Sequence, residues 1–346
     1  MFAEGHLDWM RQARTIALCG SLLLLPLGCG GSDGGPLGVD EPTDPRLVLQ
    51  PNELCSDHSE RHIATFEDAN LEAAIIGALG IGVQEDLTCG LLSELAVLVG
   101  PNDAFMDQEI KSLVGAQNLT GLTSLTLSDH SISDLSVLSG LTGLTHLDLW
   151  VNSISDISAL STLTGLTYLD LTGNSITDIG ALSGLTNLKE LVLGSNSIND
   201  IGALSGLASL TVLRLFNNSI SDISGLSGLT RLTTLDLRFN SISDISALSG
   251  LTSLRVLTLY NNSISDISAL RVLTDLGDVE GAFFRAGPDL NLSNNPNLSN
   301  IQPLLDNTGL GAGDRINLSD VNPAMPCADV ALLQAKGVTV IFNVCT

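Results

Sequence analysis

Hydrophobic positions follow a strict period of 22 residues between Leu119 and Val272. Each period reads roughly L-T-x-L-T-x-L-x-L-x-x-N-S-I-S-D-I-S-A-L-S-G, and the units follow one another without an insertion. Seven units begin at Leu119, Leu141, Leu163, Leu185, Leu207, Leu229 and Leu251. A fixed period of this length, built on L-x-x-L-x-L-x-x-N-x-I, predicts a solenoid of stacked coils.

The spacing inside one unit predicts which side chains enter the core. Leu169 and Leu171 are two residues apart, which is the period of a β-strand, so Tyr168, Asp170 and Thr172 face the opposite side. One coil cannot enclose a core, so stacked coils bury their leucines against one another. The sequence therefore predicts an α/β leucine-rich-repeat solenoid with a parallel β-sheet on the concave face. We expect short helical or irregular turns on the convex face and a cap at each end.

A column of amides recurs once in each unit. It consists of Asn152, Asn174, Asn196, Asn218, Asn240 and Asn262, with His130 at the same place in the first unit. An amide here can hydrogen-bond to backbone groups of its own coil and of the next, which a tight turn leaves unpaired. The column is therefore predicted to be structural.

A column of carboxylates is equally regular, at Asp134, Asp156, Asp178, Asp200, Asp222, Asp244 and Asp266. Each precedes a short apolar stretch, which is typical of a cap on a helical turn of the convex side. A stripe of calcium sites is the alternative. Calcium loops gather several oxygen ligands around a sharp turn, whereas each coil supplies one carboxylate here, so we favour capping.

The regions that flank the repeats change pattern. Behind Asp68 a helix is predicted to end at Gly80, because apolar residues fall at helical spacing between them. After Val272 an eighth unit is interrupted at 277–288, and the tail reads strand, helix, strand. We therefore expect five segments: a signal peptide and lipidation site (1–29), a flexible tether (30–50), a helical cap with a degenerate first coil (51–118), the repeat array (119–312) and a C-terminal cap (313–346).

The first thirty residues indicate export. Arg11 and Arg14 precede an apolar run that is too short to span a membrane and has the length of a signal core. Met10 begins a cleaner signal than Met1, so translation from Met10 is an alternative start. The run ends in Leu25-Pro26-Leu27-Gly28-Cys29, which resembles a bacterial lipoprotein signal. This resemblance implies a lipid on Cys29 and a place at the outer membrane or cell surface.

Charge excludes several functions. The formal net charge is −24, from only 14 basic residues in 346. Nucleic-acid binding requires a basic surface, and docking onto anionic lipid requires basic clusters. We therefore expect no nucleic-acid partner, and contact with a membrane only through a lipid anchor. The sequence also carries no recognisable catalytic or cofactor-binding motif, so an enzyme and a bound cofactor are not expected.

Four cysteines remain once Cys19 and Cys29 are assigned to the signal and the anchor. Cys55 and Cys89 belong to one cap, and Cys327 and Cys345 belong to the other. A disulfide needs Cα atoms within about 7 Å, so we expect the pairs Cys55–Cys89 and Cys327–Cys345. The neighbouring His58 and His62 raise zinc binding as an alternative near Cys55, against a solvated turn or helix.

Packing does not dictate the outward positions of the strands, so unusual residues there indicate function. Aromatic residues make up only 3% of the chain, yet several fall on the predicted concave face together with arginines. The candidate partner-binding residues are Trp150, Phe216, Tyr260, Arg238, Tyr168, His146 and Arg214. Exposed aromatic and arginine side chains are typical of binding hot spots, although scattered exposed aromatics can also be without function.

The region from about 60 to the end resembles internalin-like bacterial leucine-rich-repeat proteins. The stretch Phe66-Glu67-Asp68-Ala69-Asn70-Leu71-Glu72-Ala73-Ala74-Ile75 is similar to their helical N-terminal cap, and the tail is similar to their C-terminal cap. The resemblance implies protein binding through the concave face. A structural or adhesive envelope protein that binds polymer or glycan is the alternative. We do not expect host invasion, because neither an immunoglobulin-like domain nor a wall-sorting signal follows the repeats.

Overall fold

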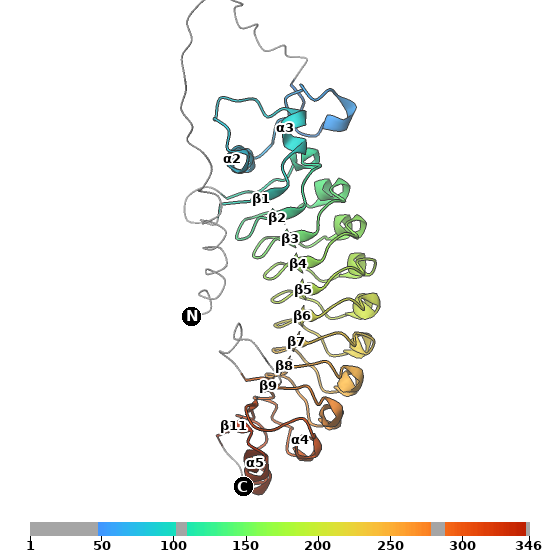
Figure 1. Cartoon of the computed structure of the whole chain (residues 1–346), viewed down its shortest axis with the longest axis vertical. Coiled ribbons are helices and arrows are strands. Elements are labelled where there is room, and N and C mark those ends of the chain that lie inside the picture. The colour runs from blue at the N-terminus through green and yellow to red at the C-terminus, as the bar shows by residue number, and fades with distance from the viewer. Residues whose placement is uncertain (1–47, 102–108, 278–287, 344–346) are drawn as a thin grey trace, which may run out of the picture. The chain divides into compact units, whose positions relative to one another are not determined.

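The computed structural model describes residues 48–101, 109–277 and 288–343. Its strands form a single parallel β-sheet. The strands lie side by side in sequence order, from β1 at one end to β11 at the other (Figure 1). They are β1 (Val97–Val99), β2 (Ser124–Thr126), β3 (His146–Asp148), β4 (Tyr168–Asp170), β5 (Glu190–Val192), β6 (Val212–Arg214), β7 (Thr234–Asp236), β8 (Val256–Thr258), β9 (Leu290–Asn291), β10 (Arg315–Asn317) and β11 (Thr339–Ile341).

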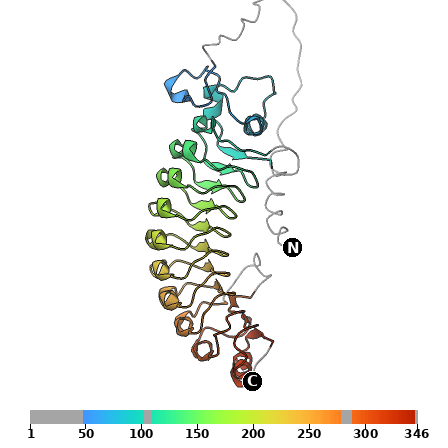
Figure 2. The same ribbon diagram turned by 180° about the vertical axis from the view of Figure 1, so that it is seen from behind.

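Short 3-10 helices cover the side opposite the sheet, as Figures 1 and 2 show from front and back. They are η2 (Ala116–Asn118), η3 (Ser136–Gly140), η4 (Ser158–Thr162), η5 (Gly180–Leu182), η6 (Gly202–Gly206), η7 (Ser224–Leu226), η8 (Ser246–Gly250) and η9 (Ser268–Val272). The other helices lie toward the two ends of the array: η1 (Cys55–Asp57), α2 (Ala69–Leu79), α3 (Cys89–Ser93), α4 (Gln302–Asp306) and α5 (Cys327–Ala335). The predicted leucine-rich-repeat solenoid is confirmed.

The register of the sheet matches the sequence period. Leu147 pairs with Leu169, and Leu169 pairs with Leu191, so equivalent residues of successive units stack directly on one another. All three are fully buried. Each coil therefore closes the core of the coil before it, as the repeat pattern predicted.

The asparagine column forms a hydrogen-bonded ladder, but each amide bonds to the preceding coil and not to the following one. The amide of Asn196 donates to the carbonyls of Leu193 and Gly194 in its own coil and to Leu171 in the preceding coil. Its Oδ1 accepts the N–H of Ile176, also in the preceding coil. The expectation that the next coil is served was wrong. In the first unit His130 accepts the N–H of Ile110.

The aspartate column caps the convex turns as predicted. Asp156, Asp222 and Asp244 each accept the backbone N–H two residues further on, at the start of a 3-10 helix. This hydrogen bond from the backbone N–H lowers the pKa of each of these carboxyls. Among the described residues, no group of three or more His, Cys, Asp or Glu side chains is placed to hold a metal ion.

The N-terminal cap closes the first coil. Asp68 accepts the N–H groups of Asn70 and Leu71 at the start of α2, and Gly80 ends the helix in a left-handed conformation with φ +67°. Fully buried Leu71 and Ile75 direct one face of α2 into the core. The predicted helix is confirmed.

The predicted disulfide between Cys55 and Cys89 is present, with Cα atoms 5.4 Å apart. In the C-terminal cap β10, α5 and β11 form the predicted strand, helix and strand. Cys327 is also disulfide-bonded, whereas Cys345 lies outside the described residues, so its pairing stays a prediction.

The sheet extends beyond the predicted repeat array at both ends. Strand β1 lies within 51–118, and β10 and β11 lie within 313–346, so the caps continue the ladder. The signal peptide, Cys29 and nearly all of the tether fall outside the described residues. None of the helices in the described ranges is long and apolar enough to cross a membrane.

Candidate functional site

The candidate residues at the third outward position of each coil lie just beyond the strands, not on them as predicted. Trp150 follows the end of β3 by two residues, and Arg238 follows β7 in the same way. We call this set the outer column; it runs Trp150, Thr172, Gly194, Phe216, Arg238 and Tyr260 along successive coils.

A local turn fixes each outer-column residue. In several coils an aspartate accepts the N–H of the outer-column residue two positions later: Asp148 from Trp150, Asp170 from Thr172 and Asp236 from Arg238. The residue after the outer column then adopts a left-handed conformation, as at Val151 with φ 51° and Phe239 with φ 54°. This conformation reverses the chain and leaves the outer-column side chain on the concave side.

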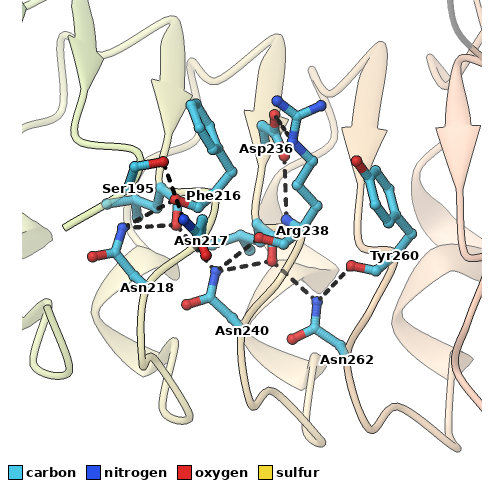
Figure 3. Close-up of polar contacts among 11 residues, drawn as sticks. Ser195, Phe216, Asn217, Asn218, Asp236, Arg238, Asn240, Tyr260 and Asn262 are labelled. Carbon is cyan, nitrogen blue, oxygen red and sulfur yellow. Dashed lines mark hydrogen bonds and ion pairs between the residues drawn. The ribbon is translucent and has the colours of Figure 1, made fainter. Parts of the chain in front are cut away.

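The C-terminal half of this face carries a compact set of side chains, which we call the C-terminal cluster: Phe216, Asp236, Arg238, Phe239 and Tyr260. The guanidinium of Arg238 lies 4.6 Å from the ring centroid of Phe216 and 5.8 Å from that of Tyr260. Phe239 meets Tyr260 edge to face, with centroids 5.0 Å apart. Figure 3 shows Phe216, Arg238 and Tyr260 side by side on successive coils. These side chains face outward and also pack against one another.

Two arginines of this half form ion pairs with carboxylates of the same face. Arg238 Nε lies 3.3 Å from Asp236 Oδ2, and Arg214 pairs with Glu190 across one coil. Burial raises the pKa of Asp236, although the nearby Arg238 opposes this shift. The charged groups of the C-terminal cluster are therefore paired within the chain, and its arginine is packed between aromatic rings, although Phe239 at its edge stays 46% exposed.

The N-terminal half carries a second set, the N-terminal cluster: His146, Asp148, Trp150, Tyr168 and Asp170. The rings of His146 and Tyr168 stack with centroids 4.2 Å apart and an interplanar angle of 11°. Trp150 is 43% exposed. Asp148 accepts a hydrogen bond from Ser128 in addition to the N–H of Trp150.

Burial also sets the protonation of the stacked pair. It lowers the pKa of His146, while the carboxylates of Asp148 and Glu190 act in the opposite direction. Burial together with nearby carboxylates raises the pKa of Tyr168 well above its usual range. At neutral pH the imidazole and the phenol are therefore both uncharged.

The predicted partner-binding residues all face the concave side, but they form two clusters instead of one. His146, Trp150 and Tyr168 lie at one end, while Phe216, Arg238 and Tyr260 lie at the other. Arg214 lies on the intervening strand β6 and pairs with Glu190.

The sequence placed Thr172 on the outward face but did not predict that two residues separate these groups. Thr172 and Gly194 occupy the outer column and are small, and the size pattern down this column would have shown the interruption. A methyl group placed on Gly194 would lie 2.2 Å from Cζ of Phe216, so the Phe216 ring covers this glycine. The small residues therefore shape both clusters.

A separate hollow of about 560 Å³ lies between α2 and β1. Its lining includes Ala73, Ala74, Gly77, Val97 and Val99. The two valines are each 51% exposed. No charged side chain lines it, but Asn70 adds a polar group to the otherwise mostly apolar lining.

Comparison with known proteins agrees with this architecture. The family model described as leucine-rich repeats (2 copies) matches residues 142–185, 186–228 and 230–272. The chain is thus a leucine-rich-repeat protein. It is 38% identical to internalin C2 of Listeria monocytogenes, over 60% of this chain and 91% of that one, with a TM-score of 0.58. The chain belongs to the internalin-like leucine-rich-repeat family, as its repeats and caps predicted.

Two further structures extend this result. An internalin, inlF, of the same species is 28% identical over 81% of this chain and 89% of that one, with a TM-score of 0.52. InlJ of Listeria monocytogenes is 20% identical over 80% of this chain and 59% of that one, with a TM-score of 0.59, and shows the shared fold alone. A search of the curated proteins finds no match.

Proposed function

We propose that this chain is an exported, non-catalytic module that binds a macromolecular partner, a protein, through its concave sheet. The single observation that carries the proposal is the exposure of Trp150. This side chain is 43% exposed on a face where the coil frame needs no aromatic residue. Large aromatic side chains and arginines dominate the energetics of protein interfaces.

Export follows from a separate observation. The Cys55–Cys89 disulfide closes the N-terminal cap, and disulfides persist mainly in oxidising compartments outside the cytosol. Together with the signal-like residues 1–29, this supports a place at the bacterial outer membrane or cell surface. We propose a lipid on Cys29 as the anchor.

A capture experiment tests binding. The full chain, immobilised, is exposed to solubilised surface proteins from candidate partner cells, and the variant Trp150→Ala/Tyr260→Ala is the comparison. Val272→Ala is the matched control, because Val272 is a large apolar residue that is 47% exposed on η9. We expect the double variant to lose the captured proteins and the control to retain them. Equal capture by all three chains would remove the proposal.

The alternative is an adhesive protein that binds envelope polymer or glycan. The stacked His146–Tyr168 pair and the exposed ring of Trp150 provide the flat aromatic faces that such ligands contact. Capture that survives protease treatment of the partner sample and is lost after glycosidase treatment would favour this alternative.

The anchor has its own test. Mass analysis of the mature N-terminus, with Cys29→Ala as control, should find a lipid-modified Cys29 in the membrane fraction. An unmodified Cys29 there would remove the anchor and leave the binding proposal standing.

A further inference from the structure

The two halves of the outer column present the same local arrangement, except that Thr172 takes the place of Arg238 and Trp150 that of Phe216. In the C-terminal half Arg238 follows Asp236 by two residues and lies over Phe216 of the preceding coil. In the N-terminal half Thr172 follows Asp170 by two residues, and the preceding coil supplies Trp150. The second arrangement thus has the aromatic ring and the carboxylate, with a short hydroxyl side chain at the place of the arginine.

The chemistry around Thr172 points to a ligand. Its Oγ1 is one of two buried side-chain polar atoms in the described residues that lack a hydrogen-bond partner. Thr172 as a whole is 9% exposed. A buried hydroxyl without a partner costs roughly 1–3 kcal/mol, so a donor that reaches this oxygen gains a hydrogen bond which the chain itself does not supply.

The charges at the outward positions of these coils indicate the charge of the ligand. The outward positions of the three coils that contain β2, β3 and β4 hold no lysine or arginine; they are Ser124, Thr126, Ser128, His146, Asp148, Trp150, Tyr168, Asp170 and Thr172. The second outward positions of the coils that carry Trp150 and Thr172 are both carboxylates, Asp148 and Asp170. The corresponding positions before Phe216 and Arg238 are Arg214 and Asp236. One half therefore supplies its own cation, and the other half presents only negative charge beside its aromatic ring.

We infer that the N-terminal cluster binds a cationic side chain of the partner, an arginine or lysine, stacked on Trp150 and paired with Asp148. Of the two carboxylates beside Trp150, Asp148 is the accessible one, because Asp170 is only 6% exposed. This inference rests on the proposed function and specifies the partner as a basic polypeptide segment. Arg238 in the C-terminal cluster shows within the same molecule how such a group is held. A cation over a tryptophan face is favourable, and more so when a carboxylate lies nearby.

Fluorescence of Trp150 can test this inference directly. The chain has two tryptophans, Trp9 and Trp150, so Trp9→Phe leaves Trp150 as the sole reporter. The probe is the blocked tripeptide acetyl-Gly-Arg-Gly-amide, with the Glu and Ser analogues as comparisons. We expect a saturable change with the arginine peptide and none with the other two.

Matched variants separate a specific site from the general negative charge. Asp148→Asn and Asp222→Asn each remove one carboxylate that accepts a backbone N–H two residues on, one on the concave side and one on the convex side. We expect Asp148→Asn to lower the affinity for the arginine peptide at least about fivefold and Asp222→Asn to leave this affinity unchanged. Thr172→Arg should abolish binding, because it places a guanidinium of the chain itself on Trp150.

The inference is overturned if the serine peptide binds as well as the arginine peptide, if Asp222→Asn weakens binding as much as Asp148→Asn, or if Thr172→Arg still binds. Circular dichroism of each variant confirms that it is folded. The capture experiment is independent of these outcomes. If Trp150→Ala/Tyr260→Ala loses the captured partner but the peptides show no preference for arginine, the binding function stands and its cationic specificity does not.

Discussion

The two clusters on the concave face are built on nearly identical coils, yet they differ in how many of their contacts lie within the chain. In the C-terminal cluster Arg238 is held between two rings and pairs with Asp236. In the N-terminal cluster Trp150 remains 43% exposed, with carboxylates nearby and no arginine. The repeat supplies equivalent positions, and the side chains in the outer column decide whether a position is satisfied internally or offered to a partner. The predictions below break or sharpen this contrast.

The largest effect is expected where the ladder passes between the two clusters. Asn196→Ala removes the acceptor for the N–H of Ile176 and the donor to three carbonyls. Since each buried backbone group left without a partner costs roughly 1–3 kcal/mol, we expect a loss of about 3 kcal/mol, measured by chemical denaturation. Asn187→Ala is the control, because exposed Asn187 makes one side-chain bond, to the Thr164 carbonyl. Similar losses from both variants would show that the ladder has no special role.

A smaller effect should fall on the C-terminal cluster alone. In Gly194→Ala the new methyl group meets the Phe216 ring, and the ring must leave its place under Arg238. Overpacking of this kind costs roughly 1–3 kcal/mol, and we expect about 1.5 kcal/mol because an aromatic side chain can rotate away. Gly184→Ala, where nothing lies within 4 Å, should be nearly neutral. The arginine-peptide titration of Trp150 should not change in either variant; a change in Gly194→Ala would mean that the two clusters are coupled.

Truncation of one residue in each cluster compares them directly. Arg238→Ala removes a cation from two rings and leaves the largely buried Asp236 without its ion-pair partner, so we expect a loss of about 1 kcal/mol. Trp150→Ala removes an exposed ring and should cost under about 0.5 kcal/mol. Thermal unfolding of both variants measures the difference. A larger loss from Trp150→Ala would show that this side chain has a structural role, and would weaken its assignment to a partner.

Leucine spacing was enough to predict the solenoid, because burial leaves few alternatives for residues such as Leu169 and Leu171. The helix behind Asp68 followed from its own helical spacing, and the Cys55–Cys89 disulfide from the place of both cysteines in one cap. The direction of the asparagine ladder was not predictable in this way. Asn196 can reach either neighbouring coil, and the choice depends on how the turn after Gly194 is oriented.

The division of the candidate site was missed for a related reason. The exposed residues were predicted from their type, whereas the separation depends on Thr172 and Gly194, which carry little chemistry of their own. That the Phe216 ring lies over Gly194 is a matter of side-chain direction, which the period does not specify. Whether the seven candidate residues bind a partner remains a prediction.

The smallest effect concerns pH and belongs to the N-terminal cluster. Burial lowers the pKa of His146 below its ordinary value, so the unfolded chain binds a proton more readily than the folded one. Stability is therefore complete above pH 6.5 and falls as pH drops from there toward the folded pKa. The slope has an upper limit of about 1.4 kcal/mol per pH unit, and the partial exposure of His146 keeps the expected loss well under 1 kcal/mol.

The comparison of His146→Gln with the unaltered chain isolates this contribution. Burial also lowers the pKa of His130, but His130 titrates in both chains and cancels in the difference. We expect the melting temperature of the variant to rise relative to that of the unaltered chain when the pH is lowered from 7.5 to 5.5. Equal differences at both pH values would mean that folding does not desolvate His146, and that the N-terminal cluster is more open to water than its burial indicates.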